Sequence, residues 1–239
     1  MATSRNLPTT DPSTLRSAVQ EHYTGRLEAG ACCSPMNVEV GNAPAGVPTF
    51  GCGDPNAAAA FAPGETVLDL GSGAGFDALR AAEAVGPTGM VLGVDMTPAM
   101  LQRARTAARD LGHHHVHFLE GHIETLPVPS ASVDVVISNC VVNLSSDVDA
   151  VLREAFRVLK PGGRLRISDT FRHDPDGTAS TTTTPDLEGW CACEAGAHAP
   201  EAFMAQARAA GFEAVAVDAA PEGTAVGDVY GAVLHANRP

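Results

Sequence analysis

The chain contains short apolar runs, separated by longer segments in which apolar residues recur at helical spacing. The runs are Thr66–Leu70, Met90–Asp95, Val116–Glu120, Val133–Ser138 and Gly163–Ser168. Runs of this length, bounded by glycine, proline or polar residues, are typical of buried strands. Because strands that alternate with helices form parallel sheets, the pattern predicts an α/β fold with a doubly wound, mostly parallel sheet.

The segments between these strands predict helices. They run from the glycine turn after Leu70 to about Val85, from Pro98 to Leu111 and from Asp147 to Leu159. Lys160-Pro161-Gly162-Gly163 follows the last of them, and a proline with glycines is a signal for the end of a helix.

The C-terminal third adds two more predicted helices and two more strands. The helices are expected at about Leu187–Ala197 and Pro200–Ala210, and the strands at Val215–Val217 and Val229–His235. The last two strands have no crossover helix between them, so they predict an antiparallel hairpin. This hairpin would complete a seven-stranded sheet.

The N-terminal part has a different pattern. Asp11-Pro12 is a signal for a helix start and predicts one helix at 13–27. From Gly30 to Pro55 the chain is rich in glycine, proline and asparagine, which predicts a long loop carrying cysteines. We therefore divide the chain into a disordered N-terminus (1–12), a helix with a cysteine loop (13–56), a Rossmann-like core (57–170) and a C-terminal part (171–239) that forms one compact unit with the core.

Charge and hydropathy exclude several classes of partner. The net charge is −13 and the basic residues are scattered, which argues against nucleic acid or an anionic membrane surface. No apolar run reaches the roughly 20 residues needed to span a bilayer, and the N-terminus lacks the apolar segment of a secretory signal. We expect a cytoplasmic protein that acts as a monomer.

A glycine turn follows the first predicted strand and is the candidate cofactor site. Asp69 to Gly75 reads Asp-Leu-Gly-Ser-Gly-Ala-Gly. Glycine here lets the backbone approach a ligand, and the following helix presents free N–H groups. Asp95 ends the second strand, where its carboxylate can accept both hydroxyls of a ribose. Together, Asp69 and Asp95 favour a bound nucleoside over a purely structural turn.

Two further segments complete a known pattern. With Gly121-His122-Ile123-Glu124 and Leu159-Lys160-Pro161-Gly162-Gly163, the turn resembles that of the Rossmann-like S-adenosylmethionine (SAM)-dependent methyltransferases. The resemblance implies that 57–170 binds SAM. It implies that Gly71, Ser72 and Gly73, which follow Asp69, line the methionine part of the cofactor. Asp95 and Met96 would bind the ribose and adenine, and His122, Ile123 and Glu124 would lie at the adenine edge. Asn139 and Cys140 would face the sulfonium.

The position of one of the six cysteines points to the methyl acceptor. Cys140 directly follows the fourth predicted strand, and the carboxyl ends of parallel strands face the ligand crevice. In a reducing compartment a cysteine is either a small buried side chain or a ligand or nucleophile. A cysteine beside the reactive methyl group is hard to explain by packing, which remains the alternative.

The cysteine segments resemble those of a known family. Ser138-Asn139-Cys140-Val141-Val142-Asn143-Leu144 resembles a run of the arsenite methyltransferases, and Cys193-Glu194-Ala195-Gly196-Ala197, Ala31-Cys32-Cys33 and Phe50-Gly51-Cys52-Gly53 resemble three others. The resemblance implies a SAM-dependent arsenite methyltransferase in which Cys32, Cys140 and Cys193 bind trivalent arsenic, with 171–239 supplying arsenic-binding helices. Cys33 can replace Cys32. We expect Cys52 to pack near the loop and Cys191 to point away, because residues two apart on a helix lie about 200° apart.

The chemistry of arsenic agrees with this ligand set. As(III) is soft, and thiolate is the soft ligand that proteins offer. Three thiolates leave its lone pair free to attack a methyl group, so neither a metal ion nor a general base is required. The resemblance further implies arsenite or methylarsenite as the substrate, a thiol reductant such as glutathione or thioredoxin, and a role in detoxification.

The sequence departs from the family pattern in two ways. No cysteine precedes Cys32, whereas members usually have one ahead of the first helix for disulfide exchange, and the segment from Tyr23 to Cys32 is short. Most members also continue with a C-terminal region that this sequence lacks, so the resemblance is to a short form. Both leave the number of methylations open.

Two rival functions remain from the sequence alone. One is a methyltransferase of the same fold with a carbon or oxygen acceptor, and the other is a thiol-based metalloid- or zinc-binding protein without turnover. Zinc sites typically show paired C-x₂-C spacing, which this sequence lacks. We interpret His113-His114-His115 with His117 as a solvated turn rather than a metal site.

Overall fold

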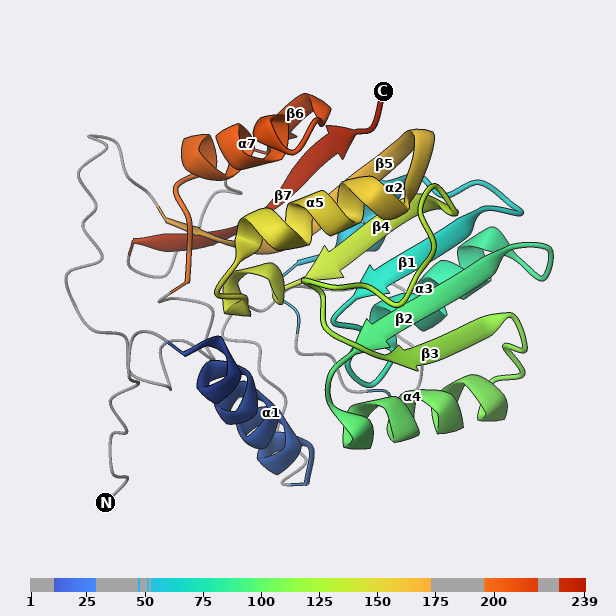
Figure 1. The fold of residues 1–239 in the computed structure, drawn as a ribbon. Coiled ribbons are helices and arrows are strands. Elements are labelled where there is room, and N and C mark those ends of the chain that lie inside the picture. Colours follow the sequence, from blue (N-terminus) through green and yellow to red (C-terminus); the bar gives the residue numbers. More distant parts are fainter. Residues whose placement is uncertain (1–10, 29–46, 48–50, 52, 173–195, 219–227) are drawn as a thin grey trace, which may run out of the picture.

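The structure is a computed structural model of the chain. It describes residues 11–28, 47, 51, 53–172, 196–218 and 228–239 (Figure 1). The predicted disorder of the first residues and most of the predicted helix at Leu187–Ala197 therefore fall outside the described residues. Of that helix, Gly196 and Ala197 are described, and neither is helical.

A seven-stranded sheet forms the centre of the molecule, in the order β3-β2-β1-β4-β5-β7-β6. The strands are β1 (Thr66–Leu70), β2 (Met90–Asp95), β3 (Val116–Glu120), β4 (Val133–Asn139), β5 (Leu159–Arg172), β6 (Glu213–Val217) and β7 (Val229–Asn237). The strands from β1 to β5 pair in parallel, and β7 pairs antiparallel with both β5 and β6. The predicted doubly wound sheet with its closing hairpin is confirmed.

Helices cover both faces of this sheet (Figure 1). They are α1 (Pro12–Glu28), α2 (Pro55–Ala59), α3 (Phe76–Val85), α4 (Pro98–Asp110), α5 (Val148–Val158) and α7 (Pro200–Ala209), with a 3-10 turn η1 (Val142–Leu144). One buried cluster joins α3 and α4 to Val67 and Ile137, and a second joins α5 and α7 to Leu68 and Ile167. Alternate residues of each strand thus face opposite layers. Among the described residues, no helix is both long and apolar enough to cross a membrane.

Two elements, α2 and η1, are too short to be predicted from periodicity. Helix α2 has only five residues, too few for an apolar repeat. It begins with Pro55 and is capped by Asp54, whose carboxylate accepts the N–H of Ala57 at 3.1 Å, an arrangement that favours a helix start. Turn η1 likewise follows β4 within the Asn-Cys-Val segment, where no repeat has room to develop.

Strand β5 is longer than predicted because it continues through Pro161-Gly162-Gly163. Leu159 pairs with Val133, and the register of β4 shifts before Val135. The N–H of Gly162 donates to the carbonyl of Arg238, and the N–H of Arg238 donates to that of Gly163. The glycine segment therefore ends α5 as predicted, but its backbone groups stay paired with the chain end.

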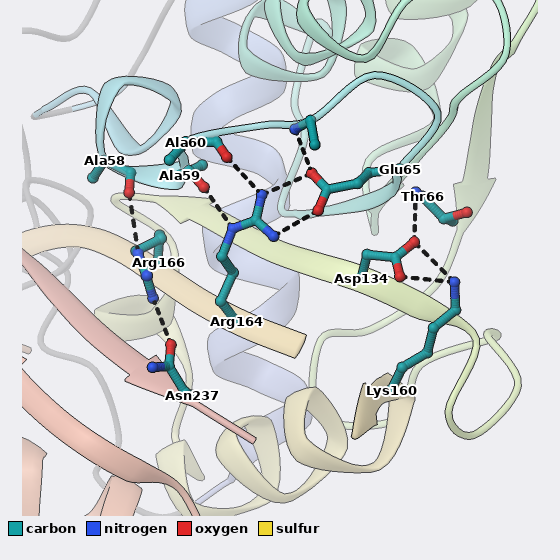
Figure 2. A network of polar contacts seen from close by, with 11 residues as sticks. Ala58, Ala59, Ala60, Glu65, Thr66, Asp134, Lys160, Arg164, Arg166 and Asn237 are labelled. Carbon is teal, nitrogen blue, oxygen red and sulfur yellow. Dashed lines mark hydrogen bonds and ion pairs between the residues drawn. The ribbon is translucent and has the colours of Figure 1, made fainter. Parts of the chain in front are cut away.

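Polar contacts fix the amino-terminal edge of the sheet (Figure 2). Arg164 on β5 forms a two-bonded ion pair with Glu65, each bond 2.7 Å long, and also donates to the carbonyls of Ala59 and Ala60. Arg166 donates to the carbonyl of Ala58. One strand thus holds the carboxyl end of α2 through guanidinium groups.

Loss of the Arg164 guanidinium should destabilise the fold. In Arg164→Met, two backbone carbonyls lose the Arg164 donor, and Glu65 keeps only the N–H of Ala62, in a site where both side chains are mostly buried. We therefore expect the free energy of unfolding to fall by about 2–3 kcal/mol. Urea unfolding measures this. Arg109→Met breaks only exposed contacts, an ion pair with Asp110 and a hydrogen bond to Thr106, and should change the free energy by less than about 0.5 kcal/mol. Equal losses in both variants would contradict the assignment.

Candidate active site

A cleft opens at the carboxyl edge of the parallel strands, as expected for a doubly wound sheet. It holds about 790 Å³ and is lined by α1, the turn after β1, the end of β2, the segment after β3, the end of β4 and η1. In Figure 1, α1 lies off the arrowhead ends of the strands.

The glycine turn after β1 forms one wall of the cleft. Gly71 has a φ of +66°, and a Cβ atom there would clash with the side chain of Val141. The N–H groups of Gly71 and Ser72 both donate to the carbonyl of Val94, at 2.8 and 3.0 Å. Only glycine allows this left-handed backbone and close approach without strain, so the turn is fixed between β2 and the acceptor side of the cleft.

Asp95 lines the cleft where β2 ends. Its two carboxylate oxygens accept the N–H groups of Gly73 at 2.9 Å and Thr97 at 2.8 Å. Burial raises the pKa of Asp95 above its ordinary value, against the lowering effect of these hydrogen bonds. The carboxylate is thus oriented by the backbone on both sides.

The segment after β3 forms the opposite wall. His122, Ile123 and Glu124 all line the cleft. The hydroxyl of Ser145 donates to Glu124 Oε1 at 2.6 Å, which ties this wall to the segment that follows η1.

Cys140 lines the cleft directly after β4 and is 7% exposed. Its N–H donates to the carbonyl of Ser168 at 2.9 Å, and its φ is +53°. A left-handed backbone is unfavourable for a residue with a Cβ atom, and such conformations cluster at functional sites. The sulfur is disulfide-bonded.

Asn139 connects the end of β4 to two other segments. Its amide Nδ2 donates to the carbonyl of Gly53 at 2.9 Å and to Asp77 at 3.0 Å, and its Oδ1 accepts the N–H of Gly53 at 3.3 Å. The residue before Cys140 therefore holds the backbone of a segment distant in the sequence.

The glycines on either side of Cys52 lie against the neighbouring strands β4 and β5. A Cβ atom on Gly51 would overlap the amide of Asn139, and one on Gly53 would overlap the hydroxyl of Ser168. Asn139 and Ser168 are paired neighbours on β4 and β5. The motif Gly51-Cys52-Gly53 thus needs its glycines for close packing beside Cys140.

A similar close approach occurs after Cys193. A Cβ atom on Gly196 would overlap the backbone carbonyl of Asn143 in η1. Asn143 follows Cys140 by three residues, and Gly196 follows Cys193 by three. The described part of the Cys-x-x-Gly-Ala motif therefore packs on the segment that carries Cys140.

The buried carboxyl of Asp169 forms hydrogen bonds to the backbone of η1 and of β5. Asp169 accepts the N–H groups of Thr170 at 2.8 Å and Asn143 at 3.2 Å, and the Asn143 amide donates to the carbonyl of Thr170 at 2.6 Å. Burial raises the pKa of Asp169 to about 7, because these hydrogen bonds offset only part of the loss of hydration.

The structure brings most of the sequence-predicted site residues to this cleft. The predicted residues that line it are Gly71, Gly73, Asp95, Met96, His122, Ile123, Glu124, Asn139 and Cys140. Ser72 is instead buried with its hydroxyl toward β2 at Gly93. The predicted ligands Cys32 and Cys193, the alternative Cys33, and also Cys52 and Cys191 lie outside the described residues.

Asp69 does not line the cleft but lies beneath the glycine turn. It is 2% exposed, and its Oδ2 atom is buried without a hydrogen-bond partner in the part of the chain that the structure describes. Burial raises its pKa well above the ordinary value, and the neighbouring carboxylates of Asp77 and Asp95 raise it further. An unpaired buried carboxyl at this position fits a positively charged group of a ligand.

Helix α1 contributes cleft residues that the sequence interpretation missed. Arg16, Val19 and Tyr23 line the cleft from one face of the helix, and Gln20 donates to the carbonyl of Met96 at 3.1 Å. Val19 and Tyr23 recur at helical spacing, which predicts the helix but not a place in the cleft. The apolar face of this helix packs over the site, a role that spacing alone cannot distinguish from core packing.

Among the described residues, no group of three or more metal-binding side chains is present. His115 Nε2 lies 3.1 Å from the carbonyl of Ala82, and the ring packs edge-on against His113. His114 and His115 lie in the turn before β3, as predicted.

The comparisons with known proteins agree with this geometry. Residues 61–211 match the family model described as a methyltransferase domain. A crystal structure of an arsenic(III) S-adenosylmethionine methyltransferase from Chlamydomonas reinhardtii is 31% identical, with a TM-score of 0.60 over 95% of this chain and 74% of that one. The chain belongs to the arsenite methyltransferase family.

Other members extend this finding. The arsenite methyltransferase of Halobacterium salinarum is 40% identical over 90% of this chain, and that of Aquipseudomonas alcaligenes is 39% identical over 66% of it. The chain spans 61% and 51% of these two relatives' lengths. The [4+2]-cyclase SpnF, at 19% identity and a TM-score of 0.69, shares the fold.

The buried acid below η1 should make stability fall as pH rises. Asp169 has a raised pKa in the folded state, so between pH ~4 and ~7 the native protein holds a proton that the unfolded chain has released. The free energy of unfolding must therefore decrease through this window. In Asp169→Asn the decrease should be shallower, by up to about 1.4 kcal/mol per pH unit, as measured by urea unfolding at several pH values.

A matched control is Asp134→Asn. Burial acts to raise the pKa of Asp134, but the hydrogen bonds from Lys160 and Thr66 and the charges of Lys160 and Arg164 together lower it. The pH dependence that Asp134 adds to the free energy of unfolding therefore lies below this pH window. The slope should stay unchanged in this control. The same slope in Asp169→Asn and the parent protein would contradict a protonated Asp169.

Proposed function

We propose that this protein transfers a methyl group from SAM to trivalent arsenic held by cysteine thiolates. The observation that carries the proposal is the position of Cys140. It lines the cleft at the end of β4, opposite the glycine turn, in a left-handed backbone conformation. Relatives that are named arsenite methyltransferases support arsenic as the acceptor.

The residues of the cleft fit SAM as the methyl donor. The glycine turn leaves the backbone open to a ligand, the oriented carboxylate of Asp95 can accept ribose hydroxyls, and the unpaired Oδ2 of buried Asp69 suits a nearby ammonium group. When bound, SAM supplies an electrophilic methyl group on a sulfonium. The residues of the cleft orient the two reactants and keep water out of the space between them.

We propose Cys140 and Cys193 as two of the arsenic ligands. The support for Cys193 is indirect: Gly196 packs on the carbonyl of Asn143, and three residues of chain span at most about 10 Å. A thiol so close in sequence to this contact can reach the region of Cys140.

The third ligand remains a choice within the N-terminal cysteines. Family resemblance predicts Cys32, with Cys33 as the alternative, and no described contact tests either. The described contacts favour Cys52, because the glycines on both sides of it pack against Asn139 and Ser168. We therefore add Cys52 as the leading competitor for this position, in place of the packing role predicted from the sequence.

In the proposed reaction the arsenic lone pair attacks the methyl carbon as the bond from that carbon to sulfur breaks. Three thiolates remove hydroxide from arsenic, and they hold the lone pair in line with the bond that breaks. The electron pair of that bond leaves with sulfur as a neutral thioether, so no proton has to be transferred. The arsenic is formally oxidised to As(V), and a thiol reductant such as glutathione or thioredoxin is needed to return it to As(III).

The state of Cys140 bears on the same requirement. Its sulfur is disulfide-bonded in this structure, and a disulfide cannot bind As(III). We propose that a thiol reductant must open this bond before arsenic binds. This agrees with the proposed cytoplasmic location, where thiols are kept reduced, and the protein is proposed to act there as a monomer.

The central test is an incubation with SAM, glutathione and either arsenite or methylarsenite, followed by arsenic speciation. We expect methylated arsenic with both the parent protein and Cys191→Ser. Cys140→Ser and Cys193→Ser should lower the rate at least about 100-fold, because two thiolates leave arsenic exposed to hydroxide. Methylation of an organic acceptor, with none of arsenic, would refute the proposal.

Single serine variants at Cys32, Cys33 and Cys52 identify the third ligand. The described contacts predict the largest loss for Cys52→Ser. A loss confined to Cys32→Ser or Cys33→Ser would instead support the assignment from family resemblance. Tight arsenite binding without methyl transfer would support the rival metalloid-binding protein.

Gly196 provides a test that leaves all six cysteines in place. Gly196→Ala must displace the chain from the carbonyl of Asn143, so we expect arsenic methylation to fall by about tenfold or more, at nearly unchanged SAM affinity. Gly25→Ala is the matched control because a Cβ atom there meets nothing within 4 Å. Full activity of Gly196→Ala would contradict a role for this contact.

A further inference from the structure

The hydroxyl of Ser145 joins two walls of the cleft. Ser145 directly follows η1, and its hydroxyl donates to Oε1 of Glu124, in the segment after β3, at 2.6 Å. Ser145 is 8% exposed, and both residues line the cleft. A hydroxyl-to-carboxylate bond of this length belongs to the strong, charge-assisted class. The contact therefore restricts both the distance and the direction between the two walls.

A second hydrogen bond orients the same hydroxyl. It accepts the N–H of Asp147 at 3.1 Å, and the carboxylate of Asp147 caps α5 by accepting the N–H of Ala150 at 2.8 Å. The N–H of Ser145 donates to the carbonyl of Val142 in η1. A serine hydroxyl has a single proton, and here that proton goes to Glu124. One side chain thus connects the end of η1, the start of α5 and the opposite wall of the cleft.

The contact joins segments that the sheet itself holds apart. Glu124 follows β3 and Ser145 follows β4, and both β2 and β1 lie between these strands (Figure 1). Because neighbouring strands are about 4.8 Å apart, β3 and β4 are separated by roughly 14 Å. The two segments converge at the cleft, after they leave the sheet. Ile123 and Val142 belong to the same buried cluster, but apolar packing is not directional, so the hydrogen bond supplies the orientation.

A second set of contacts holds the segment of Glu124 to α5. Glu154 accepts the N–H of Leu126 at 2.7 Å, and Arg157 donates to the carbonyls of Leu126 and Val128 at 3.2 and 2.9 Å. In the described part of the chain, the lining of the cleft includes none of these four residues. Loss of Arg157 should therefore loosen this segment without breaking its link to η1.

We propose that Ser145 is a positioning residue that couples the methyl-donor side of the cleft to its acceptor side. The inference deepens the proposed function, on which its arsenic readout rests. Glu124 is restrained when the adjoining part of the cleft is occupied, and its hydrogen bond extends this restraint to Ser145 and η1. The backbone after Cys140 is then already ordered when the acceptor arrives, so acceptor binding loses less conformational entropy.

Hydrogen exchange tests the coupling without arsenic. The probe is S-adenosylhomocysteine, added to the protein with its thiols reduced. The reporters are the N–H groups of residues 144 and 145, which donate to the carbonyls of Val141 and Val142. We expect the probe to slow their exchange about tenfold in the parent protein and less than about twofold in Ser145→Ala. The comparison with and without the probe in each variant removes the local effect of the substitution.

Three further variants separate coupling from a general loss of structure. Ser145→Thr keeps the hydroxyl at an extended backbone position, with φ −77° and ψ 139°, that a β-branched residue adopts readily. It should restore the slowing to within about twofold of the parent. Ser132→Ala removes an exposed hydroxyl that donates to the carbonyl of Pro129 and should leave the slowing unchanged. Arg157→Met should lower the stability of the protein but also leave the slowing unchanged.

The methylation of arsenite gives the second readout. In Ser145→Ala we expect kcat to fall about fivefold to tenfold, while KM for SAM changes less than about threefold, because the glycine turn and Asp95 are intact. Ser145→Thr should recover most of the kcat. Arg157→Met should keep the kcat of the parent at temperatures at which it is folded.

Several outcomes would overturn the inference: no slowing by the probe in the parent, equal slowing in Ser145→Ala and the parent, no recovery in Ser145→Thr, or equal losses in Ser145→Ala and Arg157→Met. Failure of the proposed function gives a different result. If the exchange pattern holds while neither arsenite nor methylarsenite is methylated, the coupling stands and the arsenic assignment fails.

Discussion

The side-chain amide of Asn139 is the contact on which the proposed site depends. It replaces the backbone pairing that ends with β4, because it binds both the N–H and the carbonyl of Gly53. The same amide donates to Asp77 at the start of α3. Three segments that are far apart in sequence therefore meet beside Cys140, and a residue without a planar amide could not satisfy all of them.

The cleft separates two tasks between its walls. The glycine turn, Asp95 and the segment after β3 belong to the sheet core, where backbone hydrogen bonds fix every element. The acceptor side is built from shorter elements, η1 and the segment around Gly53, that rely on side-chain contacts and on glycines packed against carbonyl or amide groups. In the proposed function, the sheet core supplies the methyl-donor site, and the contacts of the acceptor side position the arsenic ligands.

The sequence predicted the sheet well because buried strands and amphipathic helices have regular periods. It also located the carboxyl-edge residues, from Gly71 to Cys140, because strand ends in a parallel sheet meet at one edge. It missed α2 and η1, which are shorter than one period, and the continuation of β5 through Gly162, which depends on pairing with Arg238. The role of α1 over the cleft was also missed, because the same apolar spacing occurs in a helix that packs on a core and in one that covers a ligand.

Side-chain networks were the least predictable part of the site. Asp54 reads in sequence as a residue of a loop, and Arg80 as the polar face of a helix; nothing in their spacing shows that they pair across 26 positions. The same holds for Gly53 and Asn139. Family resemblance supplied a ligand set that includes Cys32, whereas the packing of Gly51 and Gly53 favours Cys52. Contacts between distant segments, rather than motifs, separate these two assignments.

The central claim is that thiolates at the end of β4 bind As(III) without oxygen ligands. X-ray absorption at the arsenic edge, on the reduced protein with one equivalent of arsenite, tests it most directly. We expect a first shell made only of sulfur, and the appearance of oxygen in that shell when Cys140 is replaced by serine. An oxygen-dominated shell in the parent protein, or a shell unchanged by Cys140→Ser, would contradict it.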